Sequence, residues 1–309
     1  MLCLTPLVLV ALFPSWLYHV LDVPSYLVFH NIAEFFSVVV SMSIFGVSWF
    51  TFDQSKNRHA LFLGCVFLAI GLMDFMHTLG YAGMPAFITA NSALKSTQFW
   101  IAVRMFSALA FLASGYVQPR SSGRFLSRGL LLTMAIALSG LVFVGVTYFP
   151  SHLPATFIEG RGLTPFKTYS EYLIVLLFVF SIPAYWRRYG RSGGRQDLYF
   201  MAALVVCIFS ELAFSAYKSA FDSYNALGHA YKIAAFALIY AGVFNTAVKA
   251  PYRELVARSG ELQDQYSTLS GIIEGAGGAI FSIDRQYCYT SFNRAHAAVM
   301  EMLYGVSIE

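Results

Sequence analysis

The stretch ALFLGCVFLAIGLMDFMHTLGY, residues 60–81, decides the fold of this chain, because apolar side chains occupy almost all of its positions. A helix needs about 20 mostly apolar residues to cross the hydrocarbon core of a bilayer. A surface helix of a soluble protein has one polar face, whereas this stretch is apolar all round. It therefore predicts a transmembrane helix, in which Asp74 and His77 are the ionisable exceptions.

Seven further stretches have the same character. They are Leu4–Val20, Tyr26–Phe52, Thr97–Val117, Gly129–Phe149, Tyr169–Trp186, Leu198–Lys218 and Leu227–Val248. The first and the sixth of the resulting eight are the shortest. Because only helices and closed barrels satisfy their backbone hydrogen bonds in lipid, the chain is predicted to be an all-α integral membrane bundle of about eight transmembrane helices.

The composition supports lipid as the solvent and excludes other classes. The chain is 58% hydrophobic and 12% charged, whereas soluble domains carry about 25% charged residues. A net charge of +4, with dispersed basic residues, argues against a nucleic-acid surface. The four cysteines, Cys3, Cys65, Cys207 and Cys288, are too far apart in sequence to suggest a disulfide framework.

Basic residues in the loops predict the orientation, since cytoplasmic loops carry an excess of lysine and arginine. One set of alternate loops holds Lys56, Arg58, Arg120, Arg124, Arg128, Arg187, Arg188, Arg191 and Arg195. The opposite loops hold Lys95, Arg161 and Lys167. The first set is therefore predicted to be cytoplasmic. The chain would then cross a bacterial inner membrane with both termini on the cytoplasmic side. The abrupt apolar start leaves room for a missing upstream segment, and the chain is expected to be a fragment of a longer protein or a truncated gene product.

Two shorter segments follow the predicted membrane domain, residues 1–248. In residues 249–274, a heptad spacing relates Leu255, Leu262 and Leu269, and a second seam holds Tyr252, Ser259, Tyr266 and Ile273. This spacing predicts a parallel coiled coil that joins two copies of the chain; a surface amphipathic helix is the alternative. Residues 275–309 predict two short strands and a helix capped by Asn293.

Ionisable residues inside membrane spans are costly and are therefore candidates for function. Counted along their helices, these side chains lie about 3–12 Å below the outer membrane boundary. The candidate ligand-binding residues are His30, Glu34, Asp74, His77, Trp100, Arg104, Glu211, His229 and Lys232. Their common depth predicts one polar pocket that opens toward the periplasmic side.

Two interpretations of this pocket remain open. The residues could form an ion-pair network that fixes the helix register, since buried charges must pair in any case. They could instead hold a ligand, and His30, Glu34, Asp74 and His77 are the candidate metal ligands because bundle metal sites use such pairs. Imidazole and carboxylate suit zinc, iron, copper or nickel. Haem on two of the buried histidines, a small organic ligand and an ion are further options.

The polar positions lie in stretches that resemble the third class of bacterial membrane-associated sensor (MASE) domains. These stretches are Phe29–Ser37, Gly71–Leu79, Gln98–Arg104, Ser210–Phe214, Gly228–Lys232 and Pro251–Tyr252. The segment Ala279–Asn293 resembles the opening of a PAS domain. The resemblance implies a membrane-embedded input module that precedes PAS domains and an output domain, either a histidine kinase or a diguanylate cyclase.

We therefore expect a sensor that passes a signal through its last span to the cytoplasm. No GGDEF-type segment, phosphoacceptor histidine box or glycine-rich nucleotide motif occurs in the sequence, so the chain itself is expected not to be an enzyme. The alternative is an intramembrane metal-dependent hydrolase with an activated water, although no HExxH motif is present. A transporter is a third option, against which the lack of an internal repeat argues.

Overall fold

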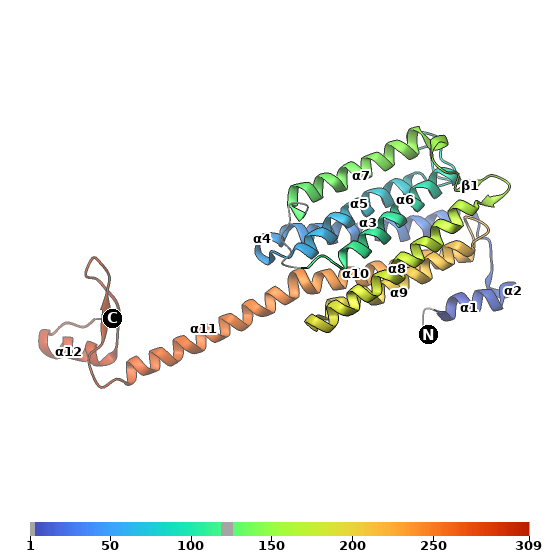
Figure 1. The fold of residues 1–309 in the computed structure, drawn as a ribbon. Coiled ribbons are helices and arrows are strands. Elements are labelled where there is room, and N and C mark those ends of the chain that lie inside the picture. Colours follow the sequence, from blue (N-terminus) through green and yellow to red (C-terminus); the bar gives the residue numbers. More distant parts are fainter. Residues whose placement is uncertain (1–3, 119–125, 309) are drawn as a thin grey trace. The chain divides into compact units, whose positions relative to one another are not determined.

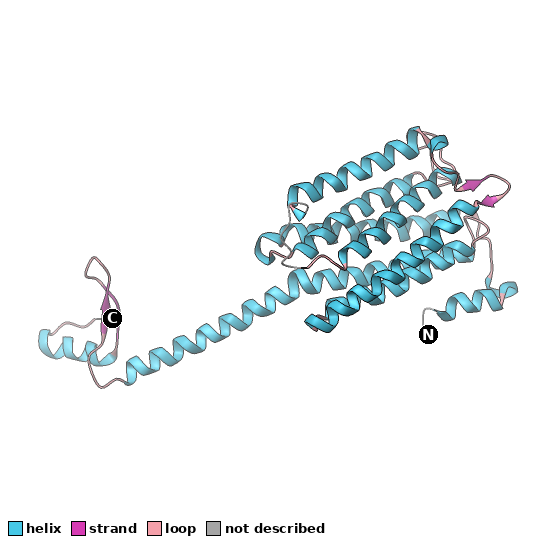
Figure 2. Ribbon diagram, in the orientation of Figure 1, coloured by secondary structure: helices cyan, strands magenta, loops and turns pink. Residues whose placement is uncertain are grey.

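Helices make up most of the chain in the computed structural model, which describes residues 4–118 and 126–308 (Figures 1 and 2). Cys3, Arg120 and Arg124 lie outside the described residues. The chain divides into two compact units, Met1–Lys249 and Ala250–Glu309.

The first unit is a bundle of long apolar helices. Seven helices of the described chain are long and apolar enough to cross a membrane. They are α3 (Val23–Phe50), α5 (Arg58–Leu79), α6 (Ala93–Ser114), α7 (Arg128–Tyr148), α8 (Pro165–Ser192), α9 (Arg195–Ala216) and α10 (Ser223–Phe244), the last within a helical run that extends to Gly275. The prediction of a helical membrane bundle is thus confirmed.

The predicted first span, Leu4–Val20, has a different structure. It folds into α1 (Leu4–Leu12) and α2 (Pro14–Leu17), which are 9 and 4 residues long. Nine helical residues rise about 14 Å, roughly half the thickness of the hydrocarbon core. Pro14 lacks the backbone N–H that a continuous helix would use there. The described residues therefore give seven candidate spans where the sequence predicted eight.

Side-chain caps fix where several of the helices begin. The cap residues Asp22, Asn57, Ser92, Thr164 and Asp222 accept hydrogen bonds from backbone N–H groups at the starts of α3, α5, α6, α8 and α10. Such a cap satisfies one of the four N–H groups that the first helical turn leaves unpaired.

Small residues bring α3 and α5 into close contact. A Cβ atom on Gly64 would lie 2.6 Å from Ser48 Cβ, and one on Gly71 would lie 2.9 Å from Ser41 Cβ. Membrane helices pack closely in this way, because small residues let their backbones approach each other. The packing places the polar face of α3 against α5, which is the arrangement that the site requires.

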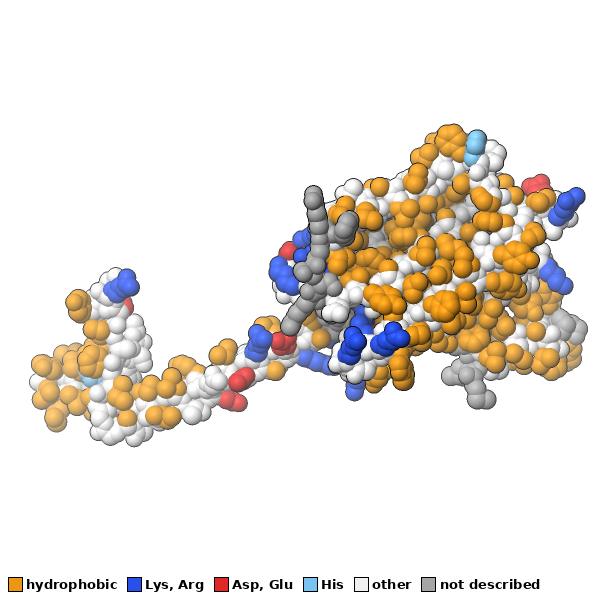
Figure 3. Space-filling model, in the orientation of Figure 1, with side chains coloured by type: hydrophobic (Ala, Val, Ile, Leu, Met, Phe, Trp, Pro, Cys, Tyr) orange, Lys and Arg blue, Asp and Glu red, His pale blue; other side chains and the backbone are white. Residues whose placement is uncertain are grey.

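The bundle has an apolar surface, as expected in lipid, and buries polar groups within a largely apolar core. Hydrophobic side chains cover the face of the bundle seen in Figure 3, and Leu130, Ile136 and Leu141 of α7 are exposed. The buried residues, in contrast, include charged groups of α3, α5, α6, α9 and α10. Water cannot solvate such groups in a bilayer, so their partners must come from the protein.

Short elements join the membrane helices. Helix α4 (Phe52–Ser55) follows α3, and a 3-10 turn, η2 (Pro150–His152), follows α7. Strands β1 (Phe157–Ile158) and β2 (Gly162–Leu163) then pair as an antiparallel hairpin before α8. A π-helical segment, η3 (Asn245–Lys249), follows α10.

The second unit consists of one long helix, a hairpin and a short helix. They are α11 (Ala250–Gly275), β3 (Phe281–Ile283), β4 (Tyr289–Phe292) and α12 (Arg294–Tyr304), and the two strands are antiparallel. Asn293 joins these parts, since its Oδ1 accepts from the backbone N–H of both His296 and Ile280 at 2.9 Å. The predicted pair of strands, the helix and its cap are all present.

Candidate functional site

All nine predicted site residues lie inside the bundle, and none is more than 4% exposed. Helix α3 carries His30 and Glu34, α5 carries Asp74 and His77, α6 carries Trp100 and Arg104, α9 carries Glu211, and α10 carries His229 and Lys232. The common depth below the membrane boundary stays a prediction, whereas the burial of these residues among the helices is observed. The predicted depth did not say which of them are partners.

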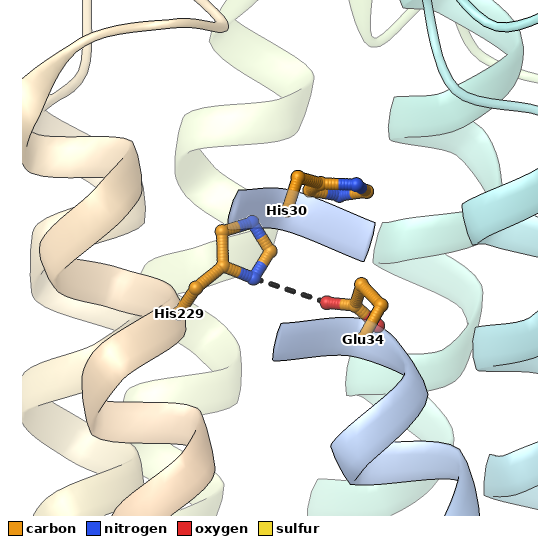
Figure 4. A group of neighbouring side chains, drawn as sticks. All are labelled: His30, Glu34 and His229. Carbon is orange, nitrogen blue, oxygen red and sulfur yellow. Dashed lines mark ion pairs between the residues drawn. The ribbon is translucent and has the colours of Figure 1, made fainter. Parts of the chain in front are cut away.

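Glu34 is the centre of the largest group of polar contacts. Lys232 Nζ lies 2.7 Å from its Oε2 atom and 3.0 Å from its Oε1 atom. His229 Nδ1 lies 3.0 Å from the same Oε1 (Figure 4). The Glu34 carboxylate therefore contacts two side chains of α10. On its own helix, Glu34 follows His30 by four residues.

Lys232 connects this carboxylate to a third helix. Its Nζ also lies 2.9 Å from Asp74 Oδ2, and 5.0 Å from the centre of the Trp100 ring. One ammonium group thus pairs with carboxylates of both α3 and α5. Two carboxylates from different helices therefore share a single ammonium group.

Three histidines surround the ion-paired groups. The His30 ring centre lies 4.8 Å from that of His229, 5.5 Å from that of His77 and 3.8 Å from that of Tyr81. His77 Nδ1 is 2.8 Å from the backbone oxygen of Ser96. Neither ring nitrogen of His30 has a hydrogen-bond partner among the described residues. A buried imidazole without partners is costly and calls for an explanation.

Three residues, His30, Glu34 and His229, lie close enough together to hold a metal ion (Figure 4). One ligand atom from each lies within 4.8 Å of the other two. Of the four metal ligands predicted from sequence, Asp74 and His77 are outside this group. Asp74 Oδ2 is turned to Lys232 and His77 Nδ1 to a backbone oxygen, while His229 enters the group from α10.

Arg104 and Glu211 form a separate ion pair. Both the Nε and the Nη2 atom of Arg104 lie 2.5 Å from Glu211 Oε1. The guanidinium group also lies 5.4 Å from the centre of the Trp100 ring. The predicted single network is therefore divided, with Trp100 between the Lys232 group and this pair.

The sequence analysis missed a third buried pair, formed by Lys167 and Glu171 on α8. Lys167 Nζ also donates to the backbone oxygen of Phe214 at 2.8 Å. Lys167 was counted as a loop residue because the apolar stretch begins only at Tyr169, but α8 begins at Pro165 and buries it completely. The four-residue spacing of a lysine and a glutamate was the available signal.

A small cavity of about 20 Å³ borders the histidines. Its lining includes His77, Tyr81, Trp100, Phe214 and His229, and also Phe157 of β1, which places it at the end of the bundle that carries the β1–β2 hairpin. A cavity of this size holds about one water molecule. The cavity thus suits an ion or a water better than a haem or a drug-sized molecule.

Close packing beside His229 gives a first testable prediction. A Cβ atom on Gly228 would lie 2.6–2.7 Å from atoms of the Phe214 ring, which packs on Trp100 and His229. Gly228→Ala is expected to lower the free energy of unfolding by about 1–3 kcal/mol, as overpacking does. Gly140→Ala on α7, where no atom lies within 4 Å, is the control. Unfolding titrations in mixed micelles measure both, and equal stabilities would contradict the packing argument.

A bundle of helices long and apolar enough to cross a membrane, packed around buried ionisable groups, defines an integral membrane protein. Residues 21–251 match the MASE3 family, described as a membrane-associated sensor domain. Since the match covers more than half of the chain, the protein belongs to this family, and the predicted resemblance to membrane-associated sensor domains is confirmed. A search of curated proteins finds no match.

Proposed function

We propose that this chain is the input module of a bacterial signal-transduction protein, and that the group formed by Glu34, Asp74, His229 and Lys232 is its sensing site. Family membership supports the role of a membrane sensor. The site is proposed from the chemistry of its residues, because buried ionisable groups in membrane spans mark sites of ion or ligand binding more often than sites of packing.

One observation carries the proposal: Lys232 of α10 pairs with carboxylates from both α3 and α5. Helix α10 belongs to the helical run that extends from Ser223 to Gly275. A stimulus that changes the partners of Lys232 would act directly on this run. It can shift the bundle between two arrangements only by its different affinity for each of them.

We further propose that the signal passes along α11 to a cytoplasmic PAS domain, of which β3, β4 and α12 are the opening elements, and then to a kinase or cyclase output domain. The chain itself would then transmit and not catalyse. The arginine-rich loops support an inner-membrane location with α11 on the cytoplasmic side. The prediction of a cytoplasmic N-terminus assumed that Leu4–Val20 crosses the membrane as one helix; this segment forms two helices of 9 and 4 residues, and the side of the N-terminus stays a prediction.

A second copy of the chain is the proposed partner of α11. Leu255, Leu262 and Leu269 are 66%, 66% and 57% exposed although they recur every seven residues on one helix face. Such a seam is typical of a helix that pairs with an identical helix. A homodimer would bury the seam and give the two output domains a common axis.

The site favours sensing over the hydrolase alternative. A hydrolase needs room for its substrate beside the activated water. The cavity next to His229 measures about 20 Å³, which accommodates about one water molecule and no acyl chain or peptide.

Neutralising Glu34 in the full-length protein is expected to change the basal output about 5–150-fold, the range of typical coupling free energies. Glu34→Gln removes the charge that holds Lys232 and His229. The measurement is kinase or cyclase activity in membranes, normalised to the amount of inserted protein. Glu171→Gln is the matched control, because it neutralises a buried glutamate whose lysine partner is on the same helix. Wild-type output from Glu34→Gln would refute the proposed site.

A further inference from the structure

The group of His30, Glu34 and His229 has the donors of a transition-metal site. Two imidazole nitrogens and a carboxylate oxygen are a ligand set that zinc enzymes and other first-row metal proteins use. The three donors come from two helices, and His30 and Glu34 are four residues apart on one face of α3. Their positions are therefore fixed by helix packing and not by a loop.

The unpartnered ring nitrogens of His30 are stronger evidence for a ligand than the presence of two imidazoles and a carboxylate. The His30 side chain is fully buried, and neither of its ring nitrogens has a partner in the described part of the chain. Figure 4 shows its ring beside the His229 and Glu34 side chains. A hydrogen-bond donor or acceptor buried without a partner costs about 1–3 kcal/mol, and a bound metal ion removes that cost for one nitrogen.

The charge at the site is also that of a cation-binding site. The carboxylates of Glu34 and Asp74 share the single ammonium group of Lys232. The neighbouring Arg104–Glu211 pair is neutral by itself and compensates for neither. Two carboxylates thus have one ammonium group between them, so a cation bound at Glu34 would leave Lys232 free to pair with Asp74 alone.

The geometry also shows what binding would move. Ligand atoms around a tetrahedral zinc ion lie about 3.3 Å apart, because each is about 2.0–2.1 Å from the metal. Glu34 Oε1 and His229 Nδ1 are already 3.0 Å apart. The group as a whole spans up to 4.8 Å, so His30 must approach the other two. Because His30 and Glu34 are on the same helix, a rotation of the His30 side chain would supply this approach.

We propose that His30, Glu34 and His229 bind one first-row divalent transition-metal ion, and that Lys232 is the internal cation that competes with it for Glu34. This inference rests on the proposed sensing site and names its ligand class. Without metal, Lys232 bridges Glu34 and Asp74. With metal, Glu34 coordinates the ion, and Lys232 remains paired only with Asp74. The metal ion then connects α3 and α10. The small cavity beside His229 supplies room for a water molecule as a further ligand.

Zn²⁺ binding to the purified chain in lipid nanodiscs tests the proposal. The wild type is expected to bind about one Zn²⁺ per chain, and His30→Ala is expected to weaken binding at least about 100-fold, since even residues that only support a ligand cost 10–100-fold. His59→Ala is the matched control. His59 is also buried with an unpartnered Nε2, but it lies at the other end of α5. It should leave the affinity unchanged.

A second variant separates a metal site from a purely structural ion-pair network. Lys232→Met removes the competing ammonium group, so it is expected to tighten Zn²⁺ binding about tenfold and to increase the stabilisation that Zn²⁺ gives compared with the wild type. A network without a metal site would instead lose stability that Zn²⁺ does not restore. Failure of the wild type to bind Zn²⁺, or equal affinities in the wild type and His30→Ala, would overturn the proposal.

The outcomes are distinguishable from those for the sensing role. If Zn²⁺ does not bind but Glu34→Gln still alters the output, the metal proposal fails and the sensing site stands. If Zn²⁺ binds as expected but Glu34→Gln leaves the output unchanged, the metal site stands and its role in sensing fails.

Discussion

Arg104→Leu is expected to lower the free energy of unfolding by about 3–5 kcal/mol, the cost of removing one partner from a buried ion pair. Glu211 is fully buried, and both nitrogen contacts that it receives at 2.5 Å come from Arg104. Without the guanidinium group its negative charge would have no compensation in a region that water does not solvate. Titration with a denaturing detergent in bicelles measures the loss.

The double variant Arg104→Leu/Glu211→Met tests the reason for this loss. Replacing both charges with apolar groups of similar size is often close to neutral, so most of the stability should return. Arg128→Leu is the control. Arg128 pairs with the exposed Asp53 and packs on Trp49, and such contacts contribute about 1–2 kcal/mol. An Arg104→Leu variant as stable as that control would show that Glu211 has another partner.

This pair also illustrates the limit of prediction from sequence. Counting residues along each span placed Arg104, Glu211 and Lys232 at a similar depth, and all three are buried. Depth cannot tell which carboxylate each cation meets, because that depends on which helices are neighbours. In the structure Arg104 pairs across α6 and α9, while Lys232 pairs across α10 and α3.

For the same reason, the sequence could not predict that His30, Glu34 and His229 form one group. The spacing of His30 and Glu34 was visible in the sequence, and it predicted correctly that they share a face of one helix. Their third partner is His229, which lies about two hundred residues away in the chain and meets Glu34 only because α10 packs against α3. Asp74 and His77 share a face of α5, but they contact Lys232 and Ser96 instead.

Hydropathy predicted the existence of the long helices better than their ends. Span six was predicted as Tyr169–Trp186, but α8 extends over Pro165–Ser192. Membrane helices continue into the polar interface, where charged residues such as Lys167 and Arg188 no longer look like part of a span. At Leu4–Val20 the predicted span was longer than the observed helices. The stretch is apolar enough for a span, but hydropathy does not detect that the helix breaks before Pro14.

Leu262→Lys is expected to separate the proposed dimer. Leu262 is the middle leucine of the exposed seam on α11, with Leu255 and Leu269 one heptad to either side. Removing a central interface residue costs about 2 kcal/mol or more. Both copies of a homodimer carry the change, so the loss is about 4 kcal/mol, or about 1,000-fold in Kd. A lysine at this seam position also places two like charges opposite each other.

Energy transfer between labelled chains in liposomes, followed as lipid is added to dilute the protein, measures this loss. Ala257→Lys is the matched control, because it adds the same charge to α11 at the heptad position opposite the leucine seam. The control should dimerise like the wild type. If Leu262→Lys and Ala257→Lys dimerise equally well, the contact between copies lies elsewhere and the seam on α11 packs against something other than its own copy. Because a parallel pairing of α11 would bring together the segments that follow it, Leu262→Lys should also abolish the effect of Glu34→Gln on the output, even though the two positions belong to different units of the chain.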